Sequence, residues 1–358
     1  MRCLSAIVLV TFSLSLFVHP AIAQQTNNDV PLIPYHSVPN FLKYSPERNL
    51  GEILGVAVNS KGRIMVLNHP GSAHNGGPLY GNATTEILEF DENGYFVREI
   101  GQGVYGLGYS HHIRYDKYDN LWLVDKGANT VIKFDPAGYV TMNLGRRPEG
   151  FDPYHHVDGA DAVPRDCYFG GPSDVAWDEE DNIFVSDGYL NSRIAKYDKH
   201  GNWIKTWGSF GSEPGQLNLP HSMHNDREGN LYVADRTNRR IQVFDSEGNF
   251  LRIILLNAPF DKSMQPVLGN VDPNQPDETQ PWAVCVSQGS PQYLWAADQH
   301  PGRIYKIQLD GKIVGMLGES GKQLGQFNWI HGIDCSQEGV LYIADLNNWR
   351  VQKLILNP

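Results

Sequence analysis

The sequence predicts an all-β protein, a six-bladed β-propeller with four-stranded blades. Three observations support this prediction. Short segments alternate apolar and polar residues with a period of two, as half-buried strands do. Turn signals such as "DKHGN" and "DSEGN" separate these segments. A strand-turn-strand unit also recurs, and its aspartate stands at Asp125, Asp187, Asp235, Asp298 and Asp345, at intervals of 62, 48, 63 and 47 residues. A unit of this length made of short strands is typical of propeller blades rather than of a helical solenoid.

The repeats place the first strand of each blade near residues 54, 111, 173, 221, 282 and 331. The copy near Leu54, "GVAVNSKGRIMVLNHPG", is irregular, and the last copy ends after its third strand, "RVQKLIL". That blade needs a fourth strand from elsewhere. We expect the stretch "SVPNFLKYS" (37–45) to supply it, because closing the ring removes exposed strand edges. Five blades plus a cap is the alternative arrangement.

The chain divides into a signal peptide at 1–23, an N-terminal extension at 24–40 and the propeller at 41–358. The first 23 residues combine Arg2, an apolar run and the small-residue site Ala21-Ile22-Ala23, which is the pattern of a secretory signal peptide. A permanent membrane anchor is the alternative, but Ser and His interrupt the run and no second apolar segment follows. We therefore expect a soluble chain that is secreted or periplasmic.

Composition narrows the possible partners. The formal net charge is −11, and no cluster of Lys and Arg is present that could displace the counterions of nucleic acid. We expect no nucleic-acid or membrane partner, but a monomer that acts on a small-molecule or peptide substrate. Cys167, Cys285 and Cys335 remain after processing, which is too few for a disulfide framework or a cysteine zinc site. A single bridge from Cys285 to Cys335 is possible.

Three histidines occupy equivalent positions in alternate blades. The residues that open the first strands are Leu54, His111, Ser173, His221, Trp282 and His331, so the histidines are 110 residues apart. First strands line the channel and alternate blades are about 120° apart in a six-bladed ring, so the three imidazoles can converge on the axis. Three neutral imidazoles with an open position are the ligands of a catalytic zinc site, although imidazole suits other divalent metals too. The alternative is that each histidine only bonds to backbone at a strand start.

Strand direction places further residues at the same end of the channel. The connections between second and third strands share a face with the first-strand starts and with the two insertions, at about 145–171 and 256–280. "SDGYLNSR" and "ADRTNRR" therefore bring Tyr189 and Arg236 to this mouth. A phenol beside a metal or cation can have a lowered pKa and act as a base, and a guanidinium can hold a carboxylate or oxyanion. Packing on the blade rim for Tyr189 and a surface ion pair for Arg236 are the alternatives.

From about residue 50 the chain resembles the catalytic domain of peptidyl-α-hydroxyglycine α-amidating lyase, within the wider group of NHL-repeat propellers. The similar stretches are "GPSDVAWDEEDNIFVSDGYLNSRI", "WGSFGSEPGQLNLPHSMH", "LYVADRTNRRIQVF" and "IHGIDCSQEGVLYIAD". The resemblance implies Zn²⁺ on His111, His221 and His331, Tyr189 as general base and Arg236 as a substrate contact. It implies cleavage of the C–N bond of an N-acyl-α-hydroxyglycine to an amide and glyoxylate, without an organic cofactor. By the alignment of "HHIRYD" with "HSMHND", His111 rather than His112 is the ligand.

The chain also departs from the family. The family anchors the glycine carboxylate with an arginine in a His-Arg-Gly stretch, where this chain has His69-Pro70-Gly71. His69 and three arginines in the first insertion, Arg146, Arg147 and Arg165, are the candidates to bind the substrate instead. The family's aspartate after the third histidine helps to bind a structural calcium ion, but Gly332 follows His331 here, which argues against a structural Ca²⁺ site. Two alternative functions remain: another metal-dependent propeller hydrolase, such as a lactonase, and a non-catalytic propeller that binds a peptide, glycan or protein.

Overall fold

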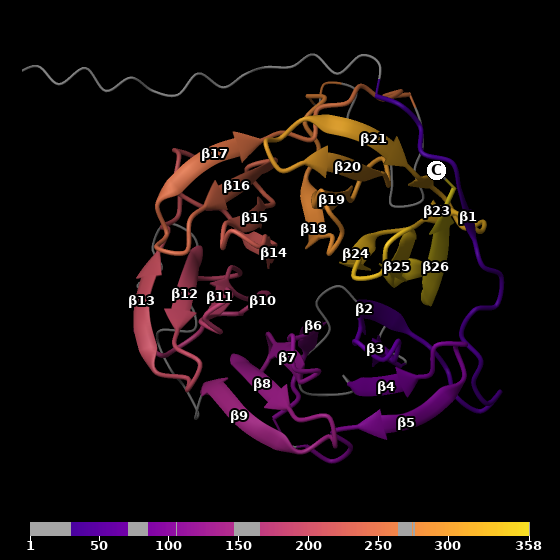
Figure 1. Ribbon diagram of the computed structural model, residues 1–358, viewed down its shortest axis with the longest axis horizontal. Helices are drawn as coiled ribbons and strands as arrows, with labels where there is room; N and C mark the ends of the chain where they lie inside the picture. Colours follow the sequence, from indigo (N-terminus) through magenta and orange to yellow (C-terminus); the bar gives the residue numbers. More distant parts are fainter. Residues whose placement is uncertain are drawn as a thin grey trace, which may run out of the picture.

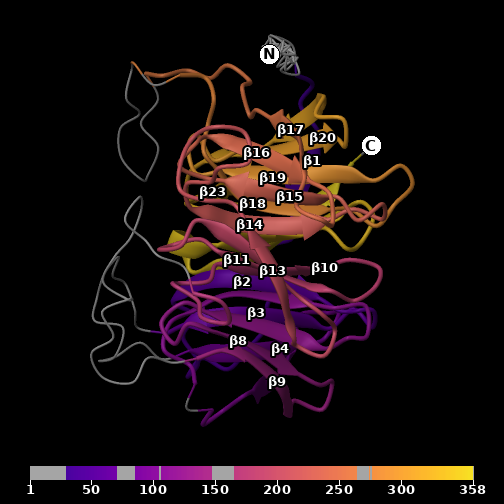
Figure 2. The same cartoon turned by 90° about the vertical axis from the view of Figure 1, so that its left-hand side faces the viewer.

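The computed structural model describes residues 30–70, 85–104, 106–146, 165–263, 274 and 276–357. These residues form six four-stranded antiparallel sheets that follow one another around a central axis (Figure 1). Seen from the side, the sheets of the second, third and fourth blades succeed one another around the ring (Figure 2). The predicted six-bladed propeller is confirmed. The proposed signal peptide at 1–23 and most of the first insertion lie outside the described residues.

Each blade runs from an inner strand at the axis to an outer strand at the rim. The strands of the first three blades are β2 (Glu52–Val58), β3 (Ile64–His69), β4 (Glu86–Phe90) and β5 (Phe96–Ile100); β6 (Ser110–Tyr115), β7 (Leu121–Asp125), β8 (Thr130–Phe134) and β9 (Val140–Gly145); and β10 (Asp174–Trp177), β11 (Ile183–Asp187), β12 (Arg193–Tyr197) and β13 (Trp203–Trp207). Those of the fourth and fifth blades are β14 (Pro220–Asn225), β15 (Leu231–Asp235), β16 (Arg240–Phe244) and β17 (Phe250–Ile254), then β18 (Pro281–Val286), β19 (Tyr293–Asp298), β20 (Ile304–Gln308) and β21 (Ile313–Leu317).

The sixth blade joins the two ends of the chain. Its strands, from the axis outward, are β24 (Ile330–Asp334), β25 (Val340–Asp345), β26 (Arg350–Leu356) and β1 (Tyr35–Ser37). A 3-10 turn, η3 (Leu346–Asn348), links β25 to β26, and a small parallel pair, β22 (Glu319–Ser320) and β23 (Gln326–Phe327), precedes the blade.

The closing strand lies earlier in the chain than predicted. It pairs Tyr35 with Leu356 and overlaps the predicted stretch 37–45 only at Ser37, within the segment assigned to the N-terminal extension. Pro39 explains the difference, because proline has no N–H to donate to a ladder. The chain beyond it passes to the first blade, where Lys43 bridges to Tyr95.

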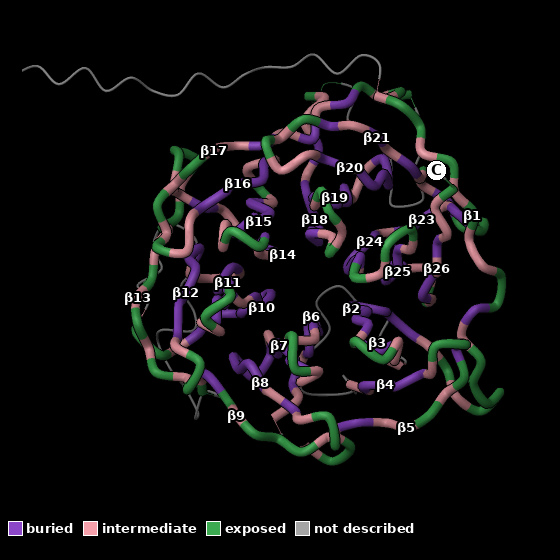
Figure 3. The backbone as a smooth tube through the Cα atoms, in the orientation of Figure 1, coloured by how far each residue is buried: buried purple, intermediate pink, exposed green. Residues whose placement is uncertain are grey.

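The core consists of apolar layers between neighbouring blades. The described residues form six clusters of this kind, one at each junction of the ring. Buried residues fill the inner and middle strands, whereas the outer strands β5, β9 and β13 are largely intermediate or exposed (Figure 3). The inner strands are thus held rigidly from both sides, which fixes the side chains that face the axis.

The repeat aspartates hold the connections between strands in place. Asp125 accepts hydrogen bonds from the N–H groups of Gly108, Tyr109 and Ala128 and from the Ser110 hydroxyl. Asp187 accepts the N–H of Gly170 and pairs with the buried guanidinium of Arg193 at 3.0 Å. Each such carboxylate therefore ties the connection between two strands to the start of its blade.

A disulfide joins Cys285 of β18 to Cys335 just after β24, as the sequence had allowed. It connects the fifth blade to the sixth, while Cys167 is a free, exposed cysteine. Among the described residues, no helix has the length and apolar character needed to cross a membrane.

Candidate metal centre

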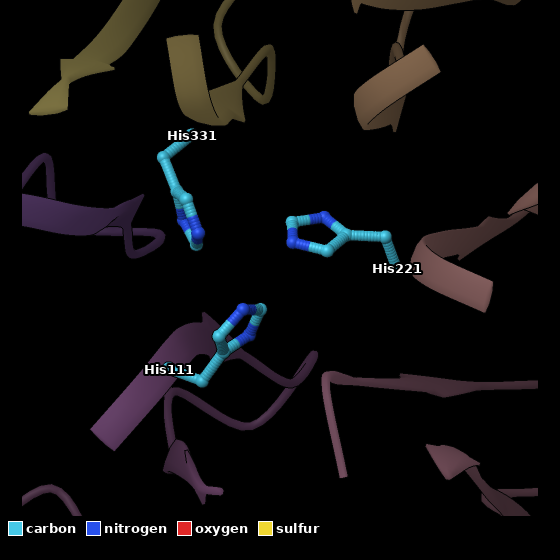
Figure 4. A group of neighbouring side chains, drawn as sticks. All are labelled: His111, His221 and His331. Carbon is cyan, nitrogen blue, oxygen red and sulfur yellow. The ribbon is translucent and has the colours of Figure 1, made fainter. Parts of the chain in front are cut away.

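The three histidines meet on the axis. The imidazoles of His111, His221 and His331 point toward one another from β6, β14 and β24 (Figure 4), and one ring nitrogen of each lies within 4.8 Å of the others. All three side chains are buried. His112, the alternative to His111, is not part of this group, and its Nε2 lies 3.6 Å from the carboxylate of Asp174.

A backbone irregularity aims these side chains at the axis. In β6, Ser110 pairs with Asp125 and His112 with Val124, so His111 is an extra residue in the ladder. The register of β24 shifts in the same way around His331, and that of β14 shifts between Pro220 and Met223, the interval that contains His221. An extra residue of this kind is a β-bulge, which redirects a side chain that strict alternation would place elsewhere.

Backbone carbonyls fix the tautomer of each imidazole. Each Nδ1 lies at hydrogen-bond distance from a main-chain oxygen of the next blade: His111 from Ser173 (2.7 Å), His221 from Trp282 (2.8 Å) and His331 from Leu54 (2.7 Å). A carbonyl can only accept, so each Nδ1 carries the proton and each Nε2 keeps its lone pair. The acceptors stand at the start of the inner strands of the blades without a histidine, within β2 and β18 and directly before β10.

Burial keeps the three imidazoles neutral. It lowers the pKa of His331 to about 3 and holds the pKa values of His111 and His221 well below 6.5; the neighbouring histidines lower that of His111 further. Three neutral imidazoles with fixed tautomers each direct an Nε2 lone pair to the axis, and the buried Nε2 of His221 has no hydrogen-bond partner among the described residues. This arrangement fits a divalent metal ion.

Tyr189 and Arg236 lie beside the histidines. The Tyr189 hydroxyl is 2.9 Å from Nε2 of His111, to which it donates because Nδ1 holds the imidazole proton. Burial raises the pKa of the Tyr189 phenol, while the charge of Arg236 and its hydrogen bond to the phenol oppose that rise. The protein alone therefore does not lower this pKa in the way the sequence had led us to expect. The Arg236 guanidinium also stacks on Trp282, with Cζ 4.0 Å from the ring centroid.

Lys126, which the sequence reasoning did not single out, lies at the same mouth. Its ammonium is 4.0 Å from the centroid of the Tyr189 ring and 4.8 Å from that of Tyr109. Burial, and secondly the charge of Arg236, lowers the pKa of Lys126 to about 8. One signal was available: Lys126 follows its repeat aspartate, Asp125, just as Arg236 follows Asp235.

The other candidate substrate contacts differ in their surroundings. His69 is buried at the end of β3, packs edge-on against Tyr109 and has its pKa lowered to about 4, mainly by burial. Arg146 is exposed just after β9, and Arg147 lies outside the described residues. The Arg165 guanidinium covers the Tyr168 ring at 4.2 Å. Among the described residues, the group that could hold a metal ion consists of His111, His221 and His331 and does not include His69.

A buried ion pair joins the inner strands of the second and third blades. Arg114 of β6 donates two hydrogen bonds to Asp174 of β10, at 2.7 and 2.8 Å, and reaches the main-chain oxygen of Val284. The charge of Arg114 opposes the burial of Asp174 and holds its pKa at about 2. A side chain in place of Gly332 would lie 3.3 to 3.4 Å from Gly55 and His112, so an aspartate after His331 would be crowded.

The fold and this centre define a six-bladed propeller with three imidazoles on its axis. No family model matches the chain. Over 225 residues the chain is 29% identical to a probable peptidyl-alpha-hydroxyglycine alpha-amidating lyase of Caenorhabditis elegans, covering 58% of this chain and 60% of that protein. It is 39% identical over 263 residues to peptidyl-glycine alpha-amidating monooxygenase A of Xenopus laevis, covering 70% of this chain and 24% of that protein. Human NHL repeat-containing protein 3 is 28% identical over 211 residues, 56% of this chain and 54% of that protein.

Solved structures support the fold alone. A streptogramin B lyase superposes with a TM-score of 0.53 at 16% identity, covering 91% of this chain and 98% of the other. An auxiliary nutrient binding protein from Bacteroides ovatus gives 0.59 at 11% identity, covering 91% and 78%. The chain is therefore similar to amidating lyases and to NHL-repeat proteins, as its motifs predicted, and spans 60% or less of the length of the three relatives described above.

Proposed function

We propose that this protein is a metal-dependent lyase that cleaves the C–N bond of an N-acyl- or peptidyl-α-hydroxyglycine and releases an amide and glyoxylate. The observation that supports it most is the set of three buried imidazoles with fixed tautomers, beside the hydroxyl of Tyr189. The similarity to relatives named as amidating lyases supports the reaction class.

His111, His221 and His331 would hold the metal through Nε2, and zinc is the ion that three neutral imidazoles with an open position suit best. A bound zinc ion would supply a Lewis acid that polarises the α-hydroxyl oxygen of the substrate. The carbonyls of Ser173, Trp282 and Leu54 would keep the rings oriented, because a hydrogen bond at Nδ1 fixes the ligand's direction and raises its basicity.

Tyr189 would act as the base. As phenolate it would take the proton of the α-hydroxyl, whose O–H electron pair becomes the second bond of the aldehyde C=O. The C–N bond then breaks, its electron pair stays on nitrogen, and Tyr189 returns the proton to that nitrogen. The step is an elimination without net oxidation, so it needs no redox partner. Arg236, which hydrogen-bonds the phenol, would favour the phenolate form and contact the substrate.

We also propose that the mature chain works in an oxidising compartment, outside the cytoplasm. The disulfide between Cys285 and Cys335 supports this, since such bonds persist in secreted and periplasmic proteins.

Release of glyoxylate from N-benzoyl-α-hydroxyglycine tests the proposal, measured against the rate in buffer and alongside metal analysis. We expect about one metal ion per chain and turnover that a chelator abolishes. Tyr189→Phe should keep the metal, and its kcat should be about 10²- to 10⁴-fold lower. Tyr139→Phe, at an exposed position on the rim of the second blade, is the matched control and should leave the rate unchanged.

A metal-loaded protein that releases no glyoxylate overturns the proposal. Hydrolysis of a lactone by that protein would then identify a different metal-dependent enzyme. Inactivity on both substrates would favour a non-catalytic propeller that binds a peptide, glycan or protein.

A further inference from the structure

Two cations at the mouth of the channel lie in contact with rings rather than with carboxylates. Lys126 and Arg236 each follow a repeat aspartate, in the second and fourth blades, and both are partly buried. The Lys126 ammonium lies over the rings of Tyr189 and Tyr109, and the Arg236 guanidinium lies over that of Trp282. The Arg236 guanidinium also hydrogen-bonds the Tyr189 phenol, so both cations border this phenol, which in turn contacts His111.

Other arginines near the repeat aspartates are neutralised. Four of them pair with the aspartate of their own blade: Arg193 with Asp187, Arg240 with Asp235, Arg303 with Asp298 and Arg350 with Asp345. Within the described ranges, Lys126 and Arg236 form no such ion pair. Holding two cations partly buried and close to each other is costly without a counter-charge. The charge of Asp125 acts on Lys126, but the oxygens of Asp125 accept hydrogen bonds from the described groups beside it, Gly108, Tyr109, Ser110 and Ala128, and form no ion pair with either cation. The two cations therefore favour a further anion at this site.

We propose that Lys126, together with Arg236, binds the carboxylate of the substrate, and that Lys126 is the residue that selects α-hydroxyglycines over neutral α-hydroxy amides. This inference rests on the proposed function, whose substrate carries one carboxylate next to the reacting carbon. The ammonium offers a compact charge with three donors, and the guanidinium offers a planar fork. The aromatic faces hold both cations in place before the substrate arrives, so little side-chain entropy is lost on binding.

The substrate's own charge provides the test. N-benzoyl-α-hydroxyglycine and its methyl ester differ in the carboxylate alone, and Lys126→Met removes the cation while keeping the length of the side chain. We expect kcat/KM on the acid to fall about 10- to 100-fold, the range expected when a hydrogen bond to a charged group is lost. The value on the ester should change less than about threefold, and Lys126→Arg should restore much of the preference for the acid.

Lys306→Met is the matched control. The Lys306 ammonium also lies over two rings, 4.0 Å from the centroid of Tyr293 and 5.7 Å from that of Trp295, but it belongs to β20 of the fifth blade. Its loss should leave both substrates unaffected. An equal loss on acid and ester in Lys126→Met, or no loss on either, would overturn the proposal.

A binding measurement separates this inference from the proposed function. N-benzoylglycine carries the carboxylate but no α-hydroxyl, and N-benzoylglycinamide carries neither, so calorimetry with the protein as purified reports carboxylate recognition without turnover. We expect the acid to bind at least about tenfold more tightly than the amide, and Lys126→Met to remove that difference. Glyoxylate release with no preference for the acid would refute the inference and keep the proposed function. Tighter binding of the acid that depends on Lys126, in a protein that releases no glyoxylate, would refute the proposed function and keep carboxylate binding by Lys126.

Discussion

The even-numbered and odd-numbered blades use the same position of the inner strand for different purposes. In the second, fourth and sixth blades it holds a histidine whose Nε2 faces the axis. In the first, third and fifth blades it provides a main-chain oxygen, at Leu54, Ser173 and Trp282, which accepts the Nδ1–H of the preceding histidine. Identity of the side chain thus matters in one half of the ring, and placement of the backbone matters in the other half.

The largest expected effect distinguishes the two sets directly. Replacing His111, His221 or His331 with alanine should weaken metal binding by at least about 10³-fold, more than the 10- to 100-fold typical for losing a partner that merely orients a ligand. Leu54→Met and Ser173→Ala keep the carbonyl and should bind metal as the parent does. Competition against a chromogenic chelator measures each affinity. Metal retention by the alanine variants, or an equal loss in Leu54→Met, would remove the distinction between the blades.

The junction between the fifth and sixth blades shows whether stability and metal binding are separable. Replacing both Cys285 and Cys335 with serine opens a loop of 50 residues and should lower the free energy of unfolding by about 2 to 4 kcal/mol, as for other disulfides. Urea denaturation measures the loss, and Cys167→Ser, at the free exposed cysteine, is the control that should show none. We expect metal affinity to stay unchanged, because the histidines and their acceptors are not altered. If metal affinity also fell, stability at this junction and metal binding by the histidines would not be separable.

The partly buried His224, outside the centre, predicts a loss of stability in acid. Burial lowers the pKa of His224 to about 4, against about 6.5 in the unfolded chain. A lowered value in the folded state means that the unfolded state binds the proton first, so stability is full above pH 6.5 and falls as the pH drops toward 4. From pH 7 to pH 5 this one group should cost about 2 kcal/mol. Between these two pH values the free energy of unfolding of His224→Gln should fall by about 2 kcal/mol less than that of the parent, measured by urea denaturation without metal. His200→Gln, at an exposed position, is the control and should show the same pH dependence as the parent. An identical pH dependence in His224→Gln would contradict the assignment.

The sequence predicts the ring and the three histidines because both follow from periodicity. A repeat of fixed length sets the angle between blades, and a spacing of 110 residues then places His111, His221 and His331 on alternate blades. The sequence does not predict the β-bulges at these positions, because one extra residue in a short strand does not visibly change the alternation of apolar and polar residues. The sequence does not reveal the Nδ1 acceptors either, because every residue has the same main-chain carbonyl whatever its side chain.

Two further features carried signals that the sequence analysis did not use. Pro39 in the predicted closing strand argued against pairing there, and β1 indeed ends at Ser37. Lys126 stands at the same point of its repeat as Arg236, but its contact with Tyr189 crosses from the second blade to the third. Contacts between blades depend on side-chain direction at the mouth, which repeat spacing alone does not determine.

The smallest expected effect concerns Trp282, an odd-blade residue that has both roles. Its carbonyl orients His221, while its ring supports the guanidinium of Arg236 and packs against Trp329 with centroids 5.0 Å apart. Trp282→Leu keeps the carbonyl and removes the ring. A cation–π contact of this kind is worth about 1 kcal/mol, so we expect kcat/KM to fall about five- to tenfold with metal affinity unchanged. Trp177→Leu, which removes a partly buried ring of the third blade that packs on Trp122, controls for the loss of an indole. A drop in metal affinity in Trp282→Leu would mean that this side chain, and not only its backbone, holds the ligand in place, and the contrast between odd and even blades would then fail at this position.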